Sequence, residues 1–223
     1  MPCRPPVTRR GTLRPHRAPM LETHNLAARR GNTRLFTGLS FRVESGQVLI
    51  VTGANGSGKT TLLRMLAGFS APASGEIRWN GTPLAPFALA LRAAAAFAGH
   101  QTALKDELTA EENLASLVAL CGERVSRESI HGALDAVALT RQRALPARVL
   151  SQGQRRRIGL ARLRLSRRPL WILDEPVTAL DAAGTALLAV LVTEHLDRGG
   201  MAVAATHTTL GLPAARMRPL ELT

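Results

Sequence analysis

The amino-acid sequence predicts an α/β fold built mainly on a parallel sheet. From Met20 onward, short apolar stretches alternate with segments of helical periodicity, which is the pattern of α/β folds. A glycine-rich motif at residues 53–60 lies between an apolar run and a helical segment, as in a strand–loop–helix unit. The length of 223 residues suits one large domain. We therefore expect a single α/β domain over residues 20–223.

Composition excludes several classes of protein. The chain is 45% hydrophobic and 20% charged, and it contains no run of about 18 uncharged apolar residues that would span a bilayer. Its two cysteines form no C-x-x-C motif, so neither a disulfide framework nor a zinc site is expected. The sequence therefore excludes a transmembrane protein and a wholly disordered one. The small number of cysteines predicts a reducing compartment.

The first 19 residues differ from the rest of the chain. They hold five prolines and five arginines without hydrophobic periodicity, a composition that does not support a packed core. We expect residues 1–19 to form a disordered basic tail, and Met20 is a candidate for the true start. An alternative interpretation of these residues is a basic arm that contacts phospholipid or RNA. Because 27 of the 29 basic residues are arginine, the net charge of +13 reflects overall composition, and no specific nucleic acid is expected.

The predicted elements follow in order along the chain. A capping box at Thr109-Ala-Glu-Glu112 opens a helix, and we expect an all-helical insert at about 102–150. The predicted strands span residues 21–26, 35–43, 47–52, 75–79, 94–98, 170–173 and 201–205, and the predicted helices span 61–68, 109–120, 126–139, a segment from 151, and about 184–196.

The glycine-rich motif, Gly53-Ala-Asn-Gly-Ser-Gly-Lys59-Thr60, matches G-x-x-x-x-G-K-[ST]. Its glycines let successive backbone N–H groups converge on phosphate oxygens at a helix N-terminus. Lys59 adds a charge at the β and γ phosphates, and the Thr60 hydroxyl is placed to hold Mg²⁺. A glycine-rich turn without a ligand is the alternative. The predicted nucleotide-binding residues are Gly53, Ala54, Asn55, Gly56, Ser57, Gly58, Lys59, Thr60 and Thr61.

Two adjacent carboxylates end the apolar strand at residues 170–173. Alternation along a strand sends the side chains of Asp174 and Glu175 to different sides, so they can have separate roles. Asp174 suits a grip on Mg²⁺, and Glu175 can polarise the water that attacks the γ-phosphorus. An ordinary solvated acidic pair at a strand end is the alternative for these two residues taken alone.

A second anion-ready helix start follows at Leu150-Ser-Gln-Gly-Gln154, where Ser151 is a good N-cap. Together with the motifs above, this segment resembles the signature motif of ATP-binding-cassette ATPases. Gln101 after a strand, Asp181 beyond the acidic pair and His207 after the last strand extend the resemblance. Taken alone, Gln101 and His207 would be structural polar residues.

The resemblance implies a P-loop, ABC-type nucleotide-binding domain with a mainly parallel sheet core, an antiparallel β part and a helical subdomain. It also implies a head-to-tail homodimer that binds ATP and Mg²⁺. Each ATP would lie between one chain's residues 53–60 and the other chain's signature residues, Ser151, Gly153 and Gln154. Gln101 would contact Mg²⁺ and the attacking water, His207 would bridge to the γ-phosphate, and Asp181 would lie at the dimer seam. The catalytic set is then Glu175, His207, Gln101 and Lys59, and the metal-binding set is Thr60, Gln101 and Asp174.

Two positions depart from the family pattern. Arg30 stands where an aromatic side chain usually stacks on adenine, although a guanidinium plane also stacks on a base. Gln152 replaces a glycine in the signature motif, and we expect little loss from that change because Ser151 and Gly153 remain.

Residues 97–114, 161–181 and 199–207 are similar to the haem-exporter ATPases of bacterial cytochrome c biogenesis. This resemblance implies membrane permease subunits of a cytochrome c maturation complex as partners and a peripheral location on the cytoplasmic face of the inner membrane. No residue suggests a haem ligand, since Cys121 falls on the apolar face of a helix and is expected in the core. The alternatives are another cargo, such as a lipid, drug or ion, and a soluble cassette ATPase of translation or repair.

Overall fold

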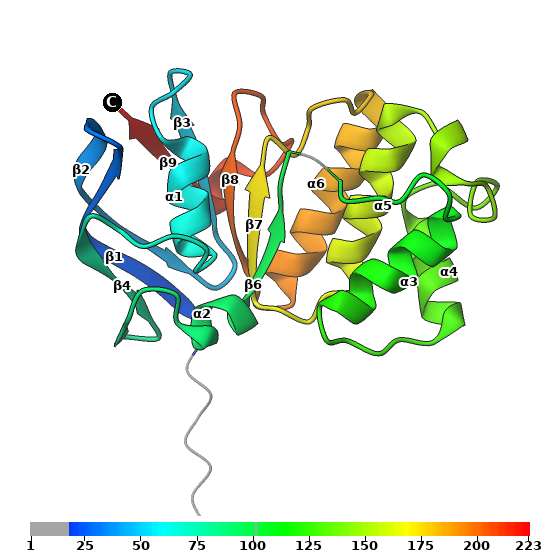
Figure 1. Cartoon of the computed structure of the whole chain (residues 1–223), viewed down its shortest axis with the longest axis horizontal. Helices are drawn as coiled ribbons and strands as arrows, with labels where there is room; N and C mark the ends of the chain where they lie inside the picture. Colours follow the sequence, from blue (N-terminus) through cyan, green and yellow to red (C-terminus); the bar gives the residue numbers. More distant parts are fainter. Residues whose placement is uncertain (1–17, 101) are drawn as a thin grey trace, which may run out of the picture.

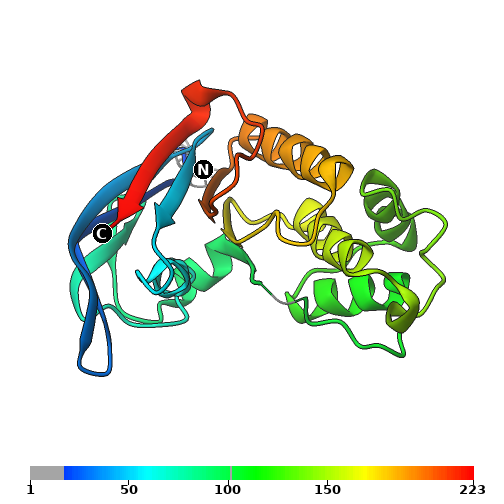
Figure 2. The same ribbon diagram turned by 90° about the horizontal axis from the view of Figure 1, so that it is seen from above.

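The computed structural model describes residues 18–100 and 102–223. A parallel sheet lies between two layers: an antiparallel sheet and helix α1 cover one face, and helices α5 and α6 cover the other (Figures 1 and 2). Helices α3 and α4 lie beyond α5 (Figure 1). The predictions for residues 1–17 and for Gln101 lie outside the described residues.

The antiparallel sheet has the order β2-β1-β4-β5. It consists of β1 (Met20–Arg30), β2 (Thr33–Glu44), β4 (Ser74–Trp79) and β5 (Thr82–Leu84). The sequence prediction missed β5, although Asn80-Gly81 is a strong hairpin signal. Asn80 and Gly81 both have positive φ, 54° and 80°, as a two-residue type I′ turn requires.

The parallel sheet has the order β6-β7-β8-β3-β9. Its strands are β3 (Val48–Gly53), β6 (Ala95–Ala98), β7 (Leu170–Asp174), β8 (Met201–Ala205) and β9 (Met217–Leu222), and every neighbouring pair is parallel. The prediction missed β9, which contains Pro219. Because the strands are parallel, the segments that follow β3, β6, β7 and β8 emerge at the same end of the sheet.

The helices agree with the predicted pattern except at α2. The structure confirms the capping box of α3, in which the Thr109 Oγ1 accepts from the Glu112 N–H and the Glu112 carboxylate accepts from the Thr109 N–H. Helix α2 was missed: Ala94, predicted as strand, is its last residue. The helical elements are α1 (Lys59–Leu66), α2 (Leu89–Ala94), α3 (Ala110–Leu120), α4 (Arg127–Ala136), η1 (Ala147–Val149), α5 (Gln152–Leu165), α6 (Ala182–Asp197) and η2 (Ala214–Arg216).

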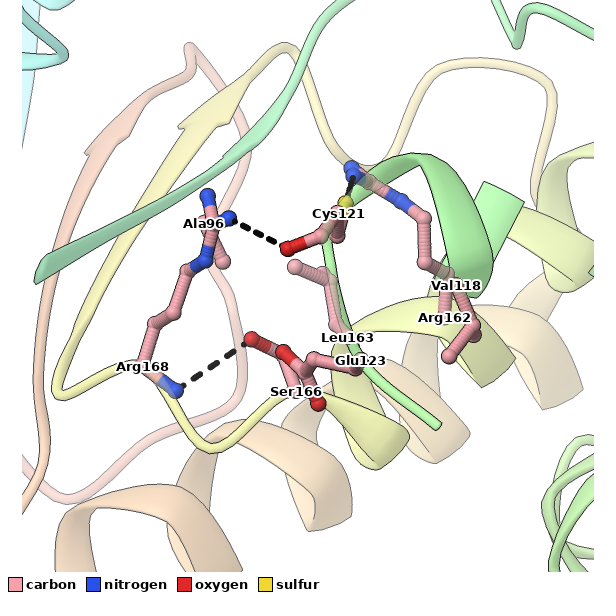
Figure 3. Close-up of a pocket in the computed structure, with 8 residues that line it drawn as sticks. All are labelled: Ala96, Val118, Cys121, Glu123, Arg162, Leu163, Ser166 and Arg168. Atoms are coloured by element: carbon pink, nitrogen blue, oxygen red, sulfur yellow. Dashed lines mark hydrogen bonds between the residues drawn. The ribbon is translucent and has the colours of Figure 1, made fainter. Parts of the chain in front are cut away.

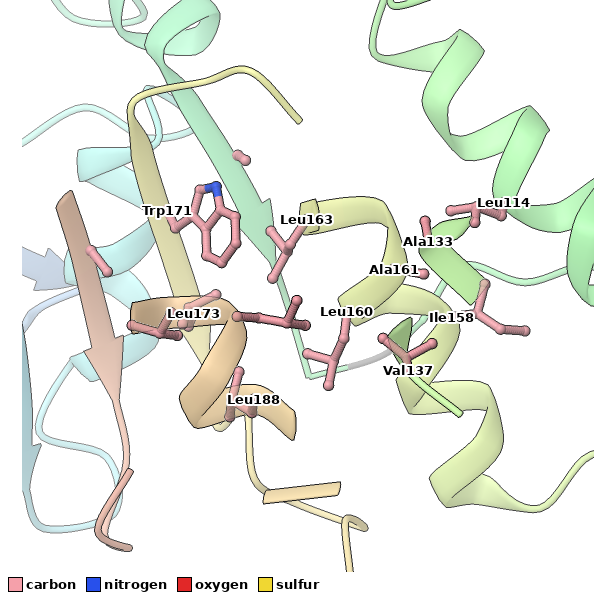
Figure 4. Close-up of a cluster of buried hydrophobic side chains, with 14 of the residues drawn as sticks. Leu114, Ala133, Val137, Ile158, Leu160, Ala161, Leu163, Trp171, Leu173 and Leu188 are labelled. Atoms are coloured by element: carbon pink, nitrogen blue, oxygen red, sulfur yellow. The ribbon is translucent and has the colours of Figure 1, made fainter. Parts of the chain in front are cut away.

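Strand β7 joins the two hydrophobic cores. Trp171 and Leu173 pack on one face with α5 and α6 (Figure 4), and Leu170 and Ile172 pack on the other with α1. A strand that is buried on both faces appears in sequence as a continuous apolar run, which is why this strand was predictable. Because β7 is packed on both faces, the position of Asp174 and Glu175 at its carboxyl end is well defined.

Candidate functional site

A cleft at the carboxyl end of the parallel sheet brings most of the predicted nucleotide-binding residues together. Its volume is about 330 Å³. Arg30 lines it from the end of β1, and Asp174 and Glu175 line it from the end of β7. The remaining lining residues are Leu35, Asn55, Gly56, Gly58, Lys59, Thr60 and Thr61.

The phosphate loop, residues 53–60, depends on glycine at two crowded positions. Gly53 has φ of 141°, and a Cβ there would lie 2.5 Å from the Leu222 carbonyl oxygen. Gly58 has φ of 101°, and a Cβ there would lie 3.1 Å from the Phe36 ring. Side-chain-bearing residues would be strained at both positions. The chain is thereby turned so that α1 starts in the cleft, where its first N–H groups are donors for an anion.

Lys59 lies within the phosphate loop. Its Nζ donates to the carbonyl oxygens of Gly53 and Ala54, at 2.6 and 3.0 Å. The nearby Ser57 Oγ is buried and has no hydrogen-bond partner among the described residues. An ammonium group, an unpartnered hydroxyl and free helix N–H groups form a donor set that fits phosphate oxygens.

Thr60 and Asp174 meet across the floor of the cleft. The Thr60 Oγ1 donates to the Asp174 carboxylate at 3.0 Å, and Asp174 is only 6% exposed. Among residues 18–100 and 102–223, no group of three or more histidine, cysteine or acidic side chains could hold a metal by itself. One hydroxyl and one carboxylate nevertheless fit Mg²⁺, because this ion usually takes one or two carboxylates plus phosphate oxygens and water.

Glu175 leaves the sheet immediately. Strand β7 ends at Asp174, and Glu175 has a left-handed φ of 48°. The expectation from strand alternation therefore does not apply to this pair, because Glu175 lies outside the pleated strand, and both residues line the same cleft. Its N–H donates to the Ala205 carbonyl oxygen of β8 at 2.9 Å, which ties the turn to the neighbouring strand.

Sequence reasoning missed Arg156. This residue of α5 is 8% exposed, and its guanidinium donates to the carbonyl oxygens of Gly99, His100, Asp174 and Glu175. Burial lowers the pKa of Arg156 below its usual range, but an arginine at neutral pH stays charged. The spacing to Leu160 and Leu163, four and seven residues on, places Arg156 on the buried face of α5 and could have revealed it.

The signature residues form a second group outside the cleft. The structure confirms Ser151 as the N-cap of α5: its Oγ accepts from the Gln154 N–H, and the Gln154 side chain accepts from the Ser151 N–H. Neither residue lines the cleft, nor does Gly153, where a Cβ would lie 3.0 Å from the Ala179 carbonyl oxygen. The start of α5 therefore abuts the turn that leads to α6.

Asp181 caps α6 beside this group. Its carboxylate accepts from the Gly184 N–H at 2.8 Å and pairs with Arg157 of α5 at 2.7 Å. The Gly184 N–H and the Arg157 guanidinium lower the pKa of Asp181. His207 follows β8 and is exposed, and it does not line the cleft. Cys121, expected in the core, is half-buried at the end of α3.

Membrane-spanning helices are absent from the part of the chain that the structure describes: none of its helices has the length and apolarity to cross a bilayer.

The comparisons with known proteins agree with these motifs. The family model described as ABC transporter matches residues 36–178. A relative from Dechloromonas aromatica named "Cytochrome c biogenesis ATP-binding export protein CcmA" is 47% identical over 91% of this chain and 100% of its own length. A relative with the same name from Pseudomonas aeruginosa is 49% identical over 88% of this chain and 97% of its own length.

Solved structures share the fold. An ABC transporter ATP-binding protein from Pyrococcus furiosus superposes with a TM-score of 0.79 at 25% identity, over 91% of this chain and 97% of that chain. A dimeric ATP-binding cassette bound to ADP and Pi superposes with a TM-score of 0.72 at 23% identity, over 84% of this chain and 88% of that chain. The chain thus belongs to the ABC transporter family of ATP-binding proteins and, within it, to the cytochrome c biogenesis ATP-binding export proteins.

Proposed function

We propose that this protein is the ATP-hydrolysing subunit that energises a separate permease in cytochrome c maturation, with haem as the exported cargo. It acts peripherally on the cytoplasmic face of the bacterial inner membrane. The single observation that carries the ATPase proposal is the cleft in which the phosphate loop, the Thr60–Asp174 pair and Glu175 converge. The names of the relatives support the role in cytochrome c biogenesis.

ATP binds with its phosphates in the phosphate loop. The Lys59 ammonium, now on two loop carbonyls, neutralises the β and γ phosphates. Arg30 lines the cleft and stacks its guanidinium on the base. Thr60 and Asp174 hold Mg²⁺, which when bound neutralises charge on the phosphate oxygens.

Glu175 directs hydrolysis. Its carboxylate orients the attacking water and accepts its proton as the oxygen bonds to the γ-phosphorus. The bond from the γ-phosphorus to the bridging oxygen breaks, and ADP and inorganic phosphate leave. The half-buried Glu175 carboxylate lies in the same cleft as Lys59 and Thr60, which supports this division of labour.

The complete site requires two chains. Ser151, Gly153 and Gln154 lie outside the cleft of their own chain, yet Ser151 begins a helix whose N-terminus is suited to an anion. A head-to-tail homodimer gives each triphosphate one phosphate loop and the partner's signature residues, with Asp181 at the seam. The family resemblance further assigns Gln101 as a residue that would help to hold Mg²⁺ and the attacking water, and His207 as one that would reach the γ-phosphate.

We also propose the domain organisation. Residues 20–223 form one ABC ATPase domain, in which 102–150 is a helical subdomain that carries α3, α4 and η1.

Glu175→Gln tests the proposal. The substitution keeps the size of the side chain and removes the proton acceptor, so we expect hydrolysis to fall by about 100-fold or more while Mg-ATP binding is retained and a dimer with bound ATP accumulates. Phosphate release, equilibrium binding and sedimentation measure these three quantities. Normal turnover in this variant would remove Glu175 from the mechanism.

The cargo is tested separately. Affinity purification of the tagged protein from detergent-solubilised membranes should recover a permease of cytochrome c assembly. Recovery of a lipid, drug or ion permease instead would keep the ATPase proposal and reject haem export.

A further inference from the structure

Three arginines cap the outer edge of the parallel sheet. Strand β6 is an edge strand, and the carbonyl oxygens of alternate residues along a strand point to the same side. Arg156 donates to the Gly99 carbonyl at 2.6 Å, Arg162 donates to that of Phe97, and Arg168 donates to that of Ala95 at 2.7 Å. Arg156 and Arg162 belong to α5, and Arg168 lies between α5 and β7. As these arginines advance along the chain, their acceptors step back from Gly99, just after β6, to Ala95 at its start.

The side chains of Arg162 and Arg168 bond β6 and also contact the end of α3 in the helical region. Arg168 donates to the Cys121 carbonyl oxygen at 3.1 Å, and Arg162 reaches the Cys121 Sγ at 3.6 Å (Figure 3). Their second contacts therefore fasten α3 to the sheet edge. These bonds lie beside the middle and the start of β6, away from the carboxyl ends of the strands where the cleft opens.

Arg156 makes its second contacts elsewhere. One amino group donates to Gly99 and His100, and the other donates to the carbonyl oxygens of Asp174 and Glu175 at 3.2 and 2.8 Å. All four acceptors are backbone carbonyls, so Arg156 fixes main chain and leaves both carboxylates free for the cleft. It is the member of the three that reaches the end of β7.

The backbone of Glu175 needs such support. A left-handed φ of 48° in a residue with a side chain costs free energy and persists only where the surroundings hold it. The Ala205 carbonyl holds the Glu175 N–H, and the Arg156 guanidinium holds the Glu175 carbonyl. Restraint on both sides of the Cα sets the direction in which the carboxylate enters the cleft.

We propose that Arg156 is a positioning residue for hydrolysis, which acts by fixing the backbone of Glu175. This inference depends on the proposed role of Glu175 as the proton acceptor. Arg156 is not among the residues that line the proposed nucleotide cleft, so its loss should lower the rate of the chemical step and leave nucleotide affinity unchanged, because small displacements of a reacting group reduce rate steeply.

Arg156→Met, Arg156→Lys and Arg162→Met test it in the full-length protein. Methionine fills a similar volume without donors, lysine keeps the charge but not the forked geometry, and Arg162→Met removes the neighbouring bond to β6 without touching β7. For Arg156→Met we expect kcat to fall by about tenfold or more and KM for ATP to stay within about twofold. Arg156→Lys should be intermediate, and Arg162→Met should keep kcat. Hydrogen exchange should accelerate at residues 174–178 in Arg156→Met only.

Three outcomes would overturn the proposal: unchanged kcat in Arg156→Met, a loss of ATP affinity equal to the loss of rate, or an equal loss of kcat in Arg162→Met. If Arg156→Met does not fold, Arg156→Lys decides, since wild-type kcat or a raised KM would reject the proposal. Turnover by the wild type together with inactivity of Glu175→Gln establishes the proposed function independently.

Discussion

His195 is an example of a single residue that is constrained by close contacts which the sequence alone does not predict. His195 is 7% exposed and stacks on Trp171 with ring centroids 4.0 Å apart. Gly200 also lies against the ring, since a Cβ at this position would lie 2.3 Å from the imidazole. The His195 Nε2 lies 3.1 Å from the Met201 carbonyl oxygen. The His195 ring is therefore closely packed against Trp171 of β7 and against Gly200, where a larger residue would clash with it.

Burial lowers the pKa of His195 below 6.5, which predicts a pH dependence of stability. Below pH 6.5 the unfolded chain binds a proton at this residue that the folded protein does not, so the free energy of unfolding falls as the pH drops toward the folded-state pKa. The slope from this one proton is at most about 1.4 kcal/mol per pH unit. Urea titrations from pH 7 to 5 should show a flatter profile for His195→Phe. The exposed His24 supplies the control, and an unchanged profile in His195→Phe would assign the effect to another group.

The position of Arg30 in the cleft leads to a prediction about the base selectivity of nucleotide binding. A guanidinium stacks on purine faces without a preference for adenine over guanine. Arg30→Ala should weaken ATP and GTP binding alike, by about tenfold, the equivalent of one lost stacking contact. Competition against a fluorescent nucleotide measures both affinities. The neighbouring Arg29, which donates to the Asn32 carbonyl, gives the matched variant Arg29→Ala. A loss confined to ATP would point to recognition of the adenine edge instead.

At the scale of elements, the capping interactions at helix N-termini stabilise the fold. The capping box of α3 satisfies backbone donors through Thr109 and Glu112, and Thr109→Ala should lower the free energy of unfolding by about 1 kcal/mol. Because α3 lies away from the cleft, kcat should not change. Thr109→Ser keeps the hydroxyl and should restore stability, as chemical denaturation would test. If the serine variant were as unstable as the alanine variant, the Thr109 methyl group rather than the cap would be responsible.

At the scale of the whole molecule, the proposed site is composite, and mixing inactive chains tests this. Lys59→Ala damages the phosphate loop and Ser151→Arg blocks the signature surface, so each homodimer should be inactive. In a mixed dimer, the intact loop of one chain faces the intact signature residues of the other. An equimolar mixture should therefore recover about a quarter of wild-type activity, since about half of the dimers are mixed and each has one working site. No recovery on mixing, with dimers demonstrated, would place the complete site within one chain.

The sequence predicted the parts whose chemistry is local. The phosphate loop, the caps at Thr109 and Ser151, and the doubly buried strand β7 each follow from neighbouring residues, and the structure contains them. The contacts of Arg156 were not predictable, because they join α5 to carbonyls 18 to 57 positions away in the chain. The direction of Glu175 was missed because a left-handed residue ends the strand, and residue type gives no sign of it.

Each edge strand of the parallel sheet has a feature that hinders further strand pairing. On one edge, guanidinium groups bond the carbonyl oxygens of Ala95 and Phe97 in β6 and of Gly99 just after it. On the other, β9 contains Pro219, which has no N–H to offer. In the proposed homodimer, these features would disfavour strand-to-strand assembly between copies and would leave their contact to surfaces that can separate again.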